Sequence, residues 1–374
     1  EMNSSVPEKL ELVVMRCLEK NPSDRYQNFE ALREELAEIY QSQFGQIPET
    51  KERVSAPEKH LASKGSMLLA LGKTEEAIPF FNSALEIDPR LIFAWIDKGM
   101  ALSMLRRHGE AMECFDKALE IDPRNADAWI RKGSAFHRQG RHREAIECFD
   151  RAIMIDHRSA IAWYNKGLVL SELGRREEAL RCFDRALEID PRNTVVFIAK
   201  GYVLRDLGKY KEALRSFDKM LEVFPRSPEA WCQKGEVLGS LGKHSEAVKC
   251  FDKALEIDAR NAGAWYNKGV ALRDMGKDGE AVDCFYRASN LNPGNVDAWA
   301  NNGLCLVKLG RYTEAIQCSD KALEINPRYA GAWASKGLAL YLLGRVHEAL
   351  DCFRKAVAIE PSMRESLKAL NIYM

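Results

Sequence analysis

A repeat of 34 residues constrains this chain more than any other feature. One repeat position holds tryptophan in seven of nine units, and Leu61 and Phe197 fill it in the other two. Glycine follows four residues later and alanine sixteen later in every unit, while phenylalanine follows twenty later in eight. The nine units fill residues 58–363 without an insertion, which is 306 of the 374 residues. This self-similarity predicts stacked small units rather than two or three independent domains. The seven tryptophans are Trp95, Trp129, Trp163, Trp231, Trp265, Trp299 and Trp333.

Each unit predicts a hairpin of two helices. In the second unit, Trp95, Gly99 and Leu102 are spaced to share one face of a first helix. Ala111 and Phe115 begin the same spacing on a second helix. A hairpin of 34 residues cannot bury such a face alone, so neighbouring hairpins must stack. We expect an all-α solenoid in which the bulky Trp95 and Phe115 fill the space between hairpins, while small residues such as Gly99 and Ala111 allow close approach.

The recurring order Trp, Gly, Leu, Ala, Phe, Ala and Pro resembles the tetratricopeptide repeat (TPR) family. The resemblance implies a right-handed superhelical solenoid of nine TPR hairpins. It also implies that the first helices line a concave groove that holds a protein or an extended peptide. Residues 364–374 would then form an incomplete capping helix.

Residues 1–40 do not follow the repeat. Residues 6–40 carry two apolar helical stripes, and residues 17–25 read Cys-Leu-Glu-Lys-Asn-Pro-Ser-Asp-Arg. This segment resembles the last two helices of a Ser/Thr protein kinase catalytic domain. The resemblance implies that Arg25 has a structural role in a buried ion pair. The chain holds no glycine-rich loop with a strand lysine, no His-Arg-Asp and no Asp-Phe-Gly, so residues 1–40 are predicted to be a non-catalytic remnant. Residues 41–57 read as a linker.

Composition excludes several classes of partner and site. The 55 basic and 55 acidic residues balance, which disfavours a surface for nucleic acid or anionic membrane. The chain has neither a long apolar run nor a signal peptide, so we expect a cytoplasmic protein.

Seven of the ten cysteines occupy one position of the second helix, which predicts small buried side chains. The histidines are scattered, with His137 and His142 the closest pair, so neither a metal nor a cofactor is predicted.

Charged residues also recur at fixed repeat positions. Glutamate fifteen residues after the tryptophan position falls in the first turn of every second helix, where the helix dipole favours it. Lysine precedes the first-helix glycine in eight units, with Asn302 as the exception. This row of lysines could attract an acidic partner. Alternatively, the lysine stems pack along the solenoid and the ammonium groups pair locally or face water.

The candidate partner-binding residues lie on another face of the first helices. One row offers polar side chains that can hydrogen-bond a peptide, namely Asp97, Arg131, Asn165, Gln233, Asn267 and Asn301. Its three asparagines resemble, incompletely, the asparagine ladder of O-linked N-acetylglucosamine transferase repeats. Beside it stand apolar candidates, namely Phe93, Ile96, Tyr164, Ile198, Tyr202 and Tyr266. These either form an exposed partner site or pack between neighbouring first helices.

The sequence therefore favours a non-catalytic scaffold that binds a protein or extended peptide and serves as the docking region of a Ser/Thr protein kinase. Because the chain begins with Glu1 rather than methionine, we expect a longer parent protein. The alternative is that it is the tail of an ATP-dependent phosphotransferase whose catalytic part is missing here. A third hypothesis is a self-assembling solenoid, joined end to end through its poorly capped last repeat.

Overall fold

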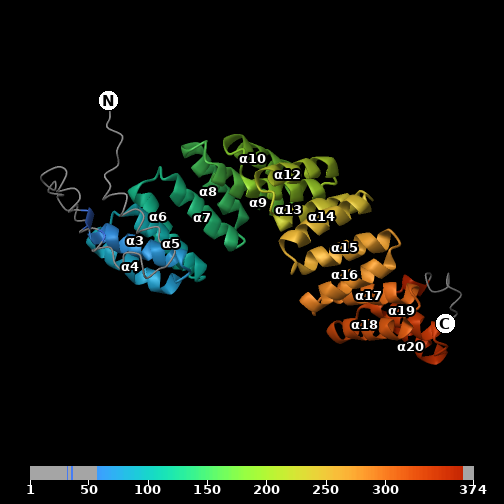
Figure 1. Ribbon diagram of the computed structural model, residues 1–374. Coiled ribbons are helices and arrows are strands. Elements are labelled where there is room, and N and C mark those ends of the chain that lie inside the picture. The colour runs from blue at the N-terminus through green and yellow to red at the C-terminus, as the bar shows by residue number, and fades with distance from the viewer. Residues whose placement is uncertain (1–31, 33–34, 37–56, 365–374) are drawn as a thin grey trace. The chain divides into compact units, whose positions relative to one another are not determined.

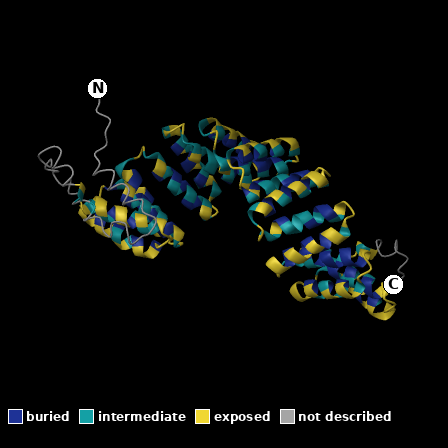
Figure 2. Cartoon of the chain, viewed as in Figure 1, coloured by how far each residue is buried: buried dark blue, intermediate teal, exposed yellow. Residues whose placement is uncertain are grey.

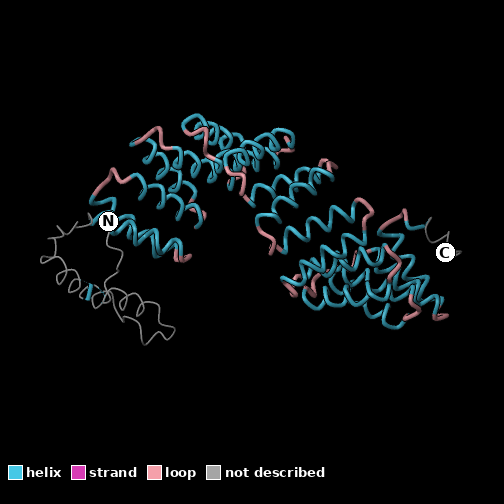
Figure 3. Tube along the Cα trace, turned by 45° about the horizontal axis from the view of Figure 1, so that its top comes forward, coloured by secondary structure: helices cyan, strands magenta, loops and turns pink. Residues whose placement is uncertain are grey.

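The computed structural model describes residue 32, residues 35–36 and residues 57–364. The helices α3–α20 fill residues 57–359, and the described part of the chain contains no strand (Figures 1 and 3). The predicted kinase-like segment with Arg25, the linker and the capping helix lie almost wholly outside the described residues, so they stay predictions. None of the helices in the described ranges is long and apolar enough to cross a membrane.

The helices form nine hairpins. The first helices are α3 (Pro57–Ala70), α5 (Ile92–Met104), α7 (Ala126–Arg138), α9 (Ala160–Glu172), α11 (Thr194–Asp206), α13 (Pro228–Ser240), α15 (Ala262–Asp274), α17 (Val296–Lys308) and α19 (Ala330–Leu342). The second helices are α4 (Thr74–Ile87), α6 (His108–Ile121), α8 (His142–Ile155), α10 (Arg176–Ile189), α12 (Tyr210–Val223), α14 (His244–Ile257), α16 (Asp278–Leu291), α18 (Tyr312–Ile325) and α20 (Val346–Ile359).

The chain divides into two compact units. Residues 1–123 contain the hairpins α3–α4 and α5–α6, and residues 124–374 contain the seven hairpins from α7 to α20. Within each unit, every helix packs against the next helix along the chain, and first helices of neighbouring hairpins also touch, as α17 and α19 do. The predicted solenoid of stacked hairpins is therefore present within each unit. Buried residues follow the packed faces of the helices and exposed residues the outer faces (Figure 2).

A contact between glycine and phenylalanine holds each hairpin together. Phe115 of α6 is 1% exposed and its ring covers Gly99 of α5. A Cβ atom added to Gly99 would lie 2.7 Å from Cε1 of Phe115, which is too close for any real contact. Seven other hairpins repeat this pair, and Ser319 replaces the phenylalanine beside Gly303 in the eighth hairpin. The recurrence of glycine at this position is therefore explained by close packing against the phenylalanine ring, and not by the geometry of a turn.

The tryptophans pack between hairpins and also make a hydrogen bond that the sequence did not predict. Trp95 of α5 is partly buried and packs against a core cluster that includes Ala62 of α3 and Phe81 of α4. Its indole Nε1 also donates a hydrogen bond of 2.8 Å to the main-chain oxygen of Pro89, at the end of the preceding repeat. Because the acceptor is a main-chain carbonyl, residues other than proline serve equally well at that position. Trp163, Trp231, Trp265, Trp299 and Trp333 make the same bond to the carbonyls of His157, Pro225, Ala259, Pro293 and Pro327.

Candidate functional site

The lysines before the first-helix glycines are engaged within the protein. Lys268 Nζ lies 2.6 Å from a carboxylate oxygen of Asp252 on the preceding second helix and 5.4 Å from the ring centre of Trp265. Lys234 makes the same ion pair, at 2.6 Å, with Asp218. This geometry agrees with the second alternative drawn from the sequence. The lysines position tryptophan rings and link neighbouring hairpins rather than forming a free basic row. Lys166, Lys200 and Lys336 pair in the same way.

Six of the seven cysteines in the row are buried, as their position predicted, and Cys318 is partly buried. Burial raises the pKa of the Cys114 and Cys250 thiols to about 11. All nine cysteines within the described residues are free thiols. Because their pKa values are raised, Cys114 and Cys250 are weak nucleophiles and weak metal ligands near neutral pH.

Two of the polar candidate residues bond to other side chains across neighbouring first helices. Gln233 of α13 accepts a hydrogen bond of 2.8 Å from Arg205 of α11. Asn267 of α15 donates one of 2.9 Å to Glu236 of α13, which also lies 3.0 Å from the Arg205 guanidinium. Burial raises the pKa of the Glu236 carboxyl, although Arg205 and Asn267 both act to lower it. The sequence did not single out Glu236, which lies at the centre of this network.

The remaining polar candidates differ in their surroundings. Asn301 of α17 accepts a bond from Arg273 and donates one of 3.4 Å to the Tyr266 hydroxyl. Arg131 pairs at 3.1 Å with Asp127 on its own helix, and Asp97 accepts a bond from a serine of the preceding hairpin. Asn165 is partly buried and has no side-chain hydrogen bond within the described residues. Asn165 is therefore the asparagine of this row whose amide is available to a partner.

Three of the apolar candidates line one hollow. Tyr164 of α9 and Ile198 and Tyr202 of α11 line a pocket of about 360 Å³, which we call the apolar pocket. The rings of Tyr164 and Tyr202 rest on buried phenylalanines, with ring centres 6.1 and 6.3 Å apart. The Tyr202 hydroxyl donates a hydrogen bond of 2.8 Å to Glu229 of α13 at the edge. The pocket is completed by Leu168, Ser171, Phe183, Val195, Ala199 and Val203.

The other apolar candidates are placed elsewhere. Ile96 of α5 is 5% exposed, so for this residue packing between helices, rather than an exposed partner site, is the correct alternative. Phe93 is 40% exposed on the same helix, in the unit of residues 1–123. Tyr266 of α15 lies with its ring centre 5.8 Å from that of Phe285. None of these three lines the apolar pocket.

A second hollow is lined mainly by α13 and α15. It has a volume of about 580 Å³ and is lined by Arg205, Glu236 and Asn267, together with His244 and Asp274, and we call it the polar pocket. Both pockets are lined in part by residues of α11 and α13. The row of first helices thus presents an apolar hollow and, further along, a polar one, an arrangement that suits an extended peptide with one apolar anchor and with hydrogen-bonding groups.

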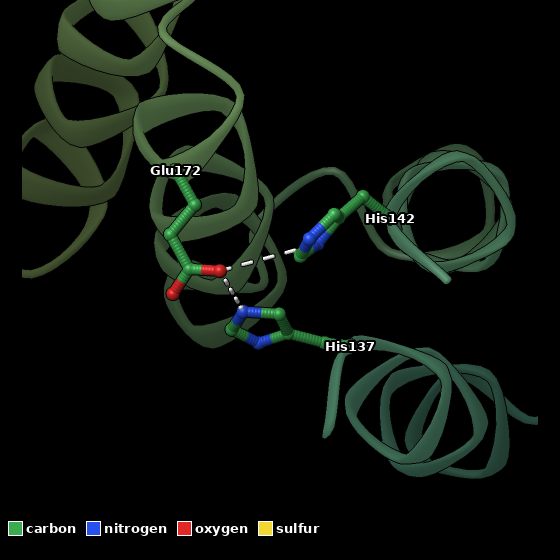
Figure 4. Close-up of side chains that lie close together, drawn as sticks. All are labelled: His137, His142 and Glu172. Carbon is green, nitrogen blue, oxygen red and sulfur yellow. Dashed lines mark hydrogen bonds and ion pairs between the residues drawn. The ribbon is translucent and has the colours of Figure 1, made fainter. Parts of the chain in front are cut away.

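A separate cluster of ligating side chains lies between the third and fourth hairpins. His137 Nε2 lies 2.8 Å from a carboxylate oxygen of Glu172, and His142 Nδ1 lies 3.9 Å from the same oxygen (Figure 4). One potential ligand atom from each residue lies within 4.8 Å of the others. The sequence had identified the two histidines only as the closest pair. Glu172 follows His137 by 35 residues, one repeat and one position, which is the signal that could have revealed the cluster.

Comparisons with known proteins agree with the fold. A family model described as tetratricopeptide repeat matches residues 92–125, 126–159, 160–193, 228–261, 296–329 and 330–363, more than half of the chain. Related tetratricopeptide repeat models match residues 61–91, 194–237 and 250–283. No curated protein matches the chain in sequence.

Solved structures are similar over parts of the chain. A tetratricopeptide repeat protein from Parabacteroides merdae is 19% identical, with a TM-score of 0.50 over 67% of this chain and 98% of that chain. The Cut9–Hcn1 hetero-tetramer of the APC/C is 17% identical, with a TM-score of 0.50 over 89% of this chain and 62% of that chain. YrrB, described as a TPR protein with an unusual peptide-binding site, is 28% identical, with a TM-score of 0.44 over 50% of this chain and 96% of that chain. By its repeated sequence and its stacked hairpins, the chain belongs to the tetratricopeptide repeat family.

Proposed function

We propose that this protein is a protein–protein interaction scaffold whose first helices bind an extended peptide segment of a partner. The observation that carries the proposal is that one row of first helices holds both the apolar pocket of Tyr164, Ile198 and Tyr202 and the polar pocket of Glu236 and Asn267. A large apolar side chain of the peptide would enter the first hollow. The peptide main chain would then meet the polar side chains of α13 and α15 and the unpaired amide of Asn165.

The hydrogen bonds within the polar pocket limit how a peptide can bind there. Arg205, Gln233, Glu236 and Asn267 already satisfy one another, so a peptide must add hydrogen bonds to them rather than replace missing ones. Leaving the buried carboxylate of Glu236 without partners would cost binding energy. We therefore infer that the polar pocket sets register and the apolar pocket supplies most of the affinity.

Peptide selection on the full chain tests this proposal. Peptides selected from a random display library are measured by fluorescence polarisation against the full chain and against Ile198→Asp, which places a charge in the apolar pocket. We expect at least about tenfold weaker binding, because a desolvated charge costs more than 1.4 kcal/mol. The matched control is Ile325→Asp, because Ile325 is 42% exposed at the end of α18 and lies outside both pockets. Equal affinities for both variants would contradict the proposed site.

Asn165→Ala tests the polar half of the site separately. The side chain of Asn165 makes no hydrogen bond within the described part of the protein, so truncating it should leave the thermal unfolding temperature unchanged and weaken the selected peptides a few-fold. Asn267→Ala, in contrast, also removes a partner of Glu236.

The remaining proposals concern the parent protein and its assembly. We propose that the scaffold docks partners for a Ser/Thr protein kinase, which rests on the resemblance of residues 6–40. An in-frame His-Arg-Asp and Asp-Phe-Gly in the upstream coding sequence would support it, and their absence would contradict it.

End-to-end assembly of the solenoid is tested by light scattering over a wide concentration range. A mass that stays that of the monomer throughout would contradict assembly. A cytoplasmic location, like the expectation that neither nucleic acid nor membrane is a partner, stays a prediction.

A further inference from the structure

We propose that His137, His142 and Glu172 form a binding site for a zinc ion that links the third and fourth hairpins. His137 stands in the last turn of α7, His142 is the first residue of α8, and Glu172 is the last residue of α9. Figure 4 shows the two imidazoles and the carboxylate converging from these three helices. The site lies within the compact unit of residues 124–374 and is independent of the proposed peptide pockets.

The ligand chemistry suits zinc. Two imidazole nitrogens and one carboxylate oxygen are a common zinc ligand set that leaves a fourth position open. With each ligand atom about 2.1 Å from the ion, tetrahedral geometry separates the atoms by roughly 3.3 Å. The separations of 2.8 and 3.9 Å from Glu172 lie on either side of this value. Small side-chain rotations would therefore bring all three atoms onto one ion.

The surroundings favour access and limited rearrangement. The side chains of His137 and His142 are 24% and 28% exposed, and that of Glu172 is 53% exposed, so the cluster lies at the surface. The Nδ1 atom of His142 is itself buried, so the rotation that brings it onto the ion must also expose it. A short turn with Gly140 at φ +73° connects the two histidines and holds them on one side of the hairpin. The nearby Arg141 guanidinium is bound by Glu144. A fourth ligand would come from water or from a bound partner.

The repeat itself distinguishes the cluster from an ordinary feature of the fold. His108 and His244 occupy the position of His142 in other hairpins, and in all three histidines the Nδ1 atom is buried without a hydrogen-bond partner among the described residues. Gly239 stands where His137 would be in the hairpin of His244. Among the described hairpins, the third is therefore the one in which a second imidazole lies beside the histidine at this position and a glutamate from the next hairpin meets both.

Zinc titration of the full chain tests the proposal. The protein is reduced, stripped of metal with a chelator and titrated with zinc chloride by isothermal calorimetry. We expect one equivalent to bind, and His137→Gln, His142→Gln and Glu172→Gln each to weaken binding by more than about tenfold, since losing even an outer-shell partner costs that much. His244→Gln is the matched control, because it removes a histidine at the same repeat position and should leave the affinity within about twofold.

A spectroscopic readout separates this site from the cysteines. Cobalt(II) in place of zinc should give visible absorption bands without thiolate charge transfer, because the proposed ligands are nitrogen and oxygen. Circular dichroism establishes that each variant is folded, which the partial exposure of the three side chains leads us to expect. Absence of zinc binding, or zinc bound equally well by the triple variant, would overturn the proposal.

Discussion

At the scale of single residues, the contact between Gly201 and Phe217 shows why glycine recurs inside a helix. A Cβ atom on Gly201 of α11 would lie 2.5 Å from two ring carbons of Phe217, which is fully buried. The helix could accept alanine at this position, but the neighbouring ring could not. The glycine therefore serves packing between the two helices, and its cost in helix propensity is offset by the buried ring.

We expect Gly201→Ala to lower the free energy of unfolding by about 1–3 kcal/mol, because the ring of Phe217 must move. The chain supplies its own control in Gly239, which also lies inside a first helix but has no atom within 4 Å of its Cβ position. Gly239→Ala should be neutral or stabilise by up to about 1 kcal/mol. Urea unfolding measures both. If both variants have the same midpoint, the ring contact does not determine the choice of glycine.

Ser319 in the eighth hairpin is the residue that departs most from this packing. It is 0% exposed at the position where eight hairpins hold phenylalanine, and its hydroxyl has no hydrogen-bond partner within the described part of the chain. Asn302, close to it in the same hairpin, is 1% exposed, and its amide oxygen also lacks a partner there. Both groups incur a desolvation cost, as the buried Ser103 hydroxyl of the second hairpin also does.

We expect Ser319→Phe to raise the free energy of unfolding by roughly 1–3 kcal/mol, since it removes a buried unpaired hydroxyl and restores the ring over Gly303. Urea unfolding of the full chain measures the change, and Ser319→Ala provides the control for the hydroxyl alone. A loss of stability in Ser319→Phe together with a gain in Ser319→Ala would mean that the eighth hairpin is too tightly packed for the ring.

At the scale of the helix, the two members of a hairpin begin in different ways. Six of the first helices have Asn or Ser at the N-cap, whose side-chain oxygen accepts a hydrogen bond from the main chain; Asn261, for example, bonds Ala264 N at 2.9 Å. The second helices begin after Lys or Arg without a side-chain cap. In most of them this basic residue pairs with the glutamate of the first turn, as Arg107 does with Glu110.

We therefore expect Asn261→Ala to destabilise the protein by about 1 kcal/mol, because the N–H of Ala264 loses its acceptor at the start of α15. Asn261→Ser keeps an acceptor and should restore most of this loss. Thermal and urea unfolding measure both variants. An Asn261→Ala midpoint equal to that of the parent chain would show that water replaces the cap without cost.

The sequence predicted the hairpins better than the candidate site, and the residues show why. Gly99 and Phe115 could be identified because the same contact recurs along the chain, so spacing alone reveals it. Tyr164, Ile198 and Tyr202 share one face by helical periodicity and do line one pocket. The bond between Asn267 and Glu236 joins residues 31 apart, and it depends on rotamers of long side chains that spacing does not determine. His137 and His142 lie on different helices, so no helical period relates them.

At the scale of the whole molecule, the balanced charge is organised as repeated local pairs. Basic N-cap residues and first-turn glutamates form ion pairs in hairpins of both compact units, from Arg107–Glu110 to Arg345–Glu348. Each pair is well exposed, so a single pair contributes little to stability. Because such pairs are numerous, together they should nevertheless make the stability of the whole protein depend on pH.

The sign of that dependence follows from the pKa values of the glutamates. A hydrogen bond from the arginine lowers the pKa of each carboxyl in the folded protein, for Glu110, Glu144, Glu178, Glu314 and Glu348. A carboxyl with a lowered folded pKa stabilises the protein above its unfolded pKa, and this stabilisation is lost as pH falls through the folded value. The pairs should therefore make the protein less stable as pH falls from about 5 to about 3.

We expect the urea midpoint of the full chain to fall between pH 6 and pH 3. A variant in which all five glutamates are replaced by glutamine should show a smaller fall, because its first turns no longer carry a titrating carboxyl. Comparing the two pH profiles isolates these residues from the other carboxylates, which both proteins share. High salt should reduce the difference, since the exposed pairs are screened. Parallel profiles for the two proteins would mean that these glutamates do not link stability to pH, whether through the arginines or through the helix dipole.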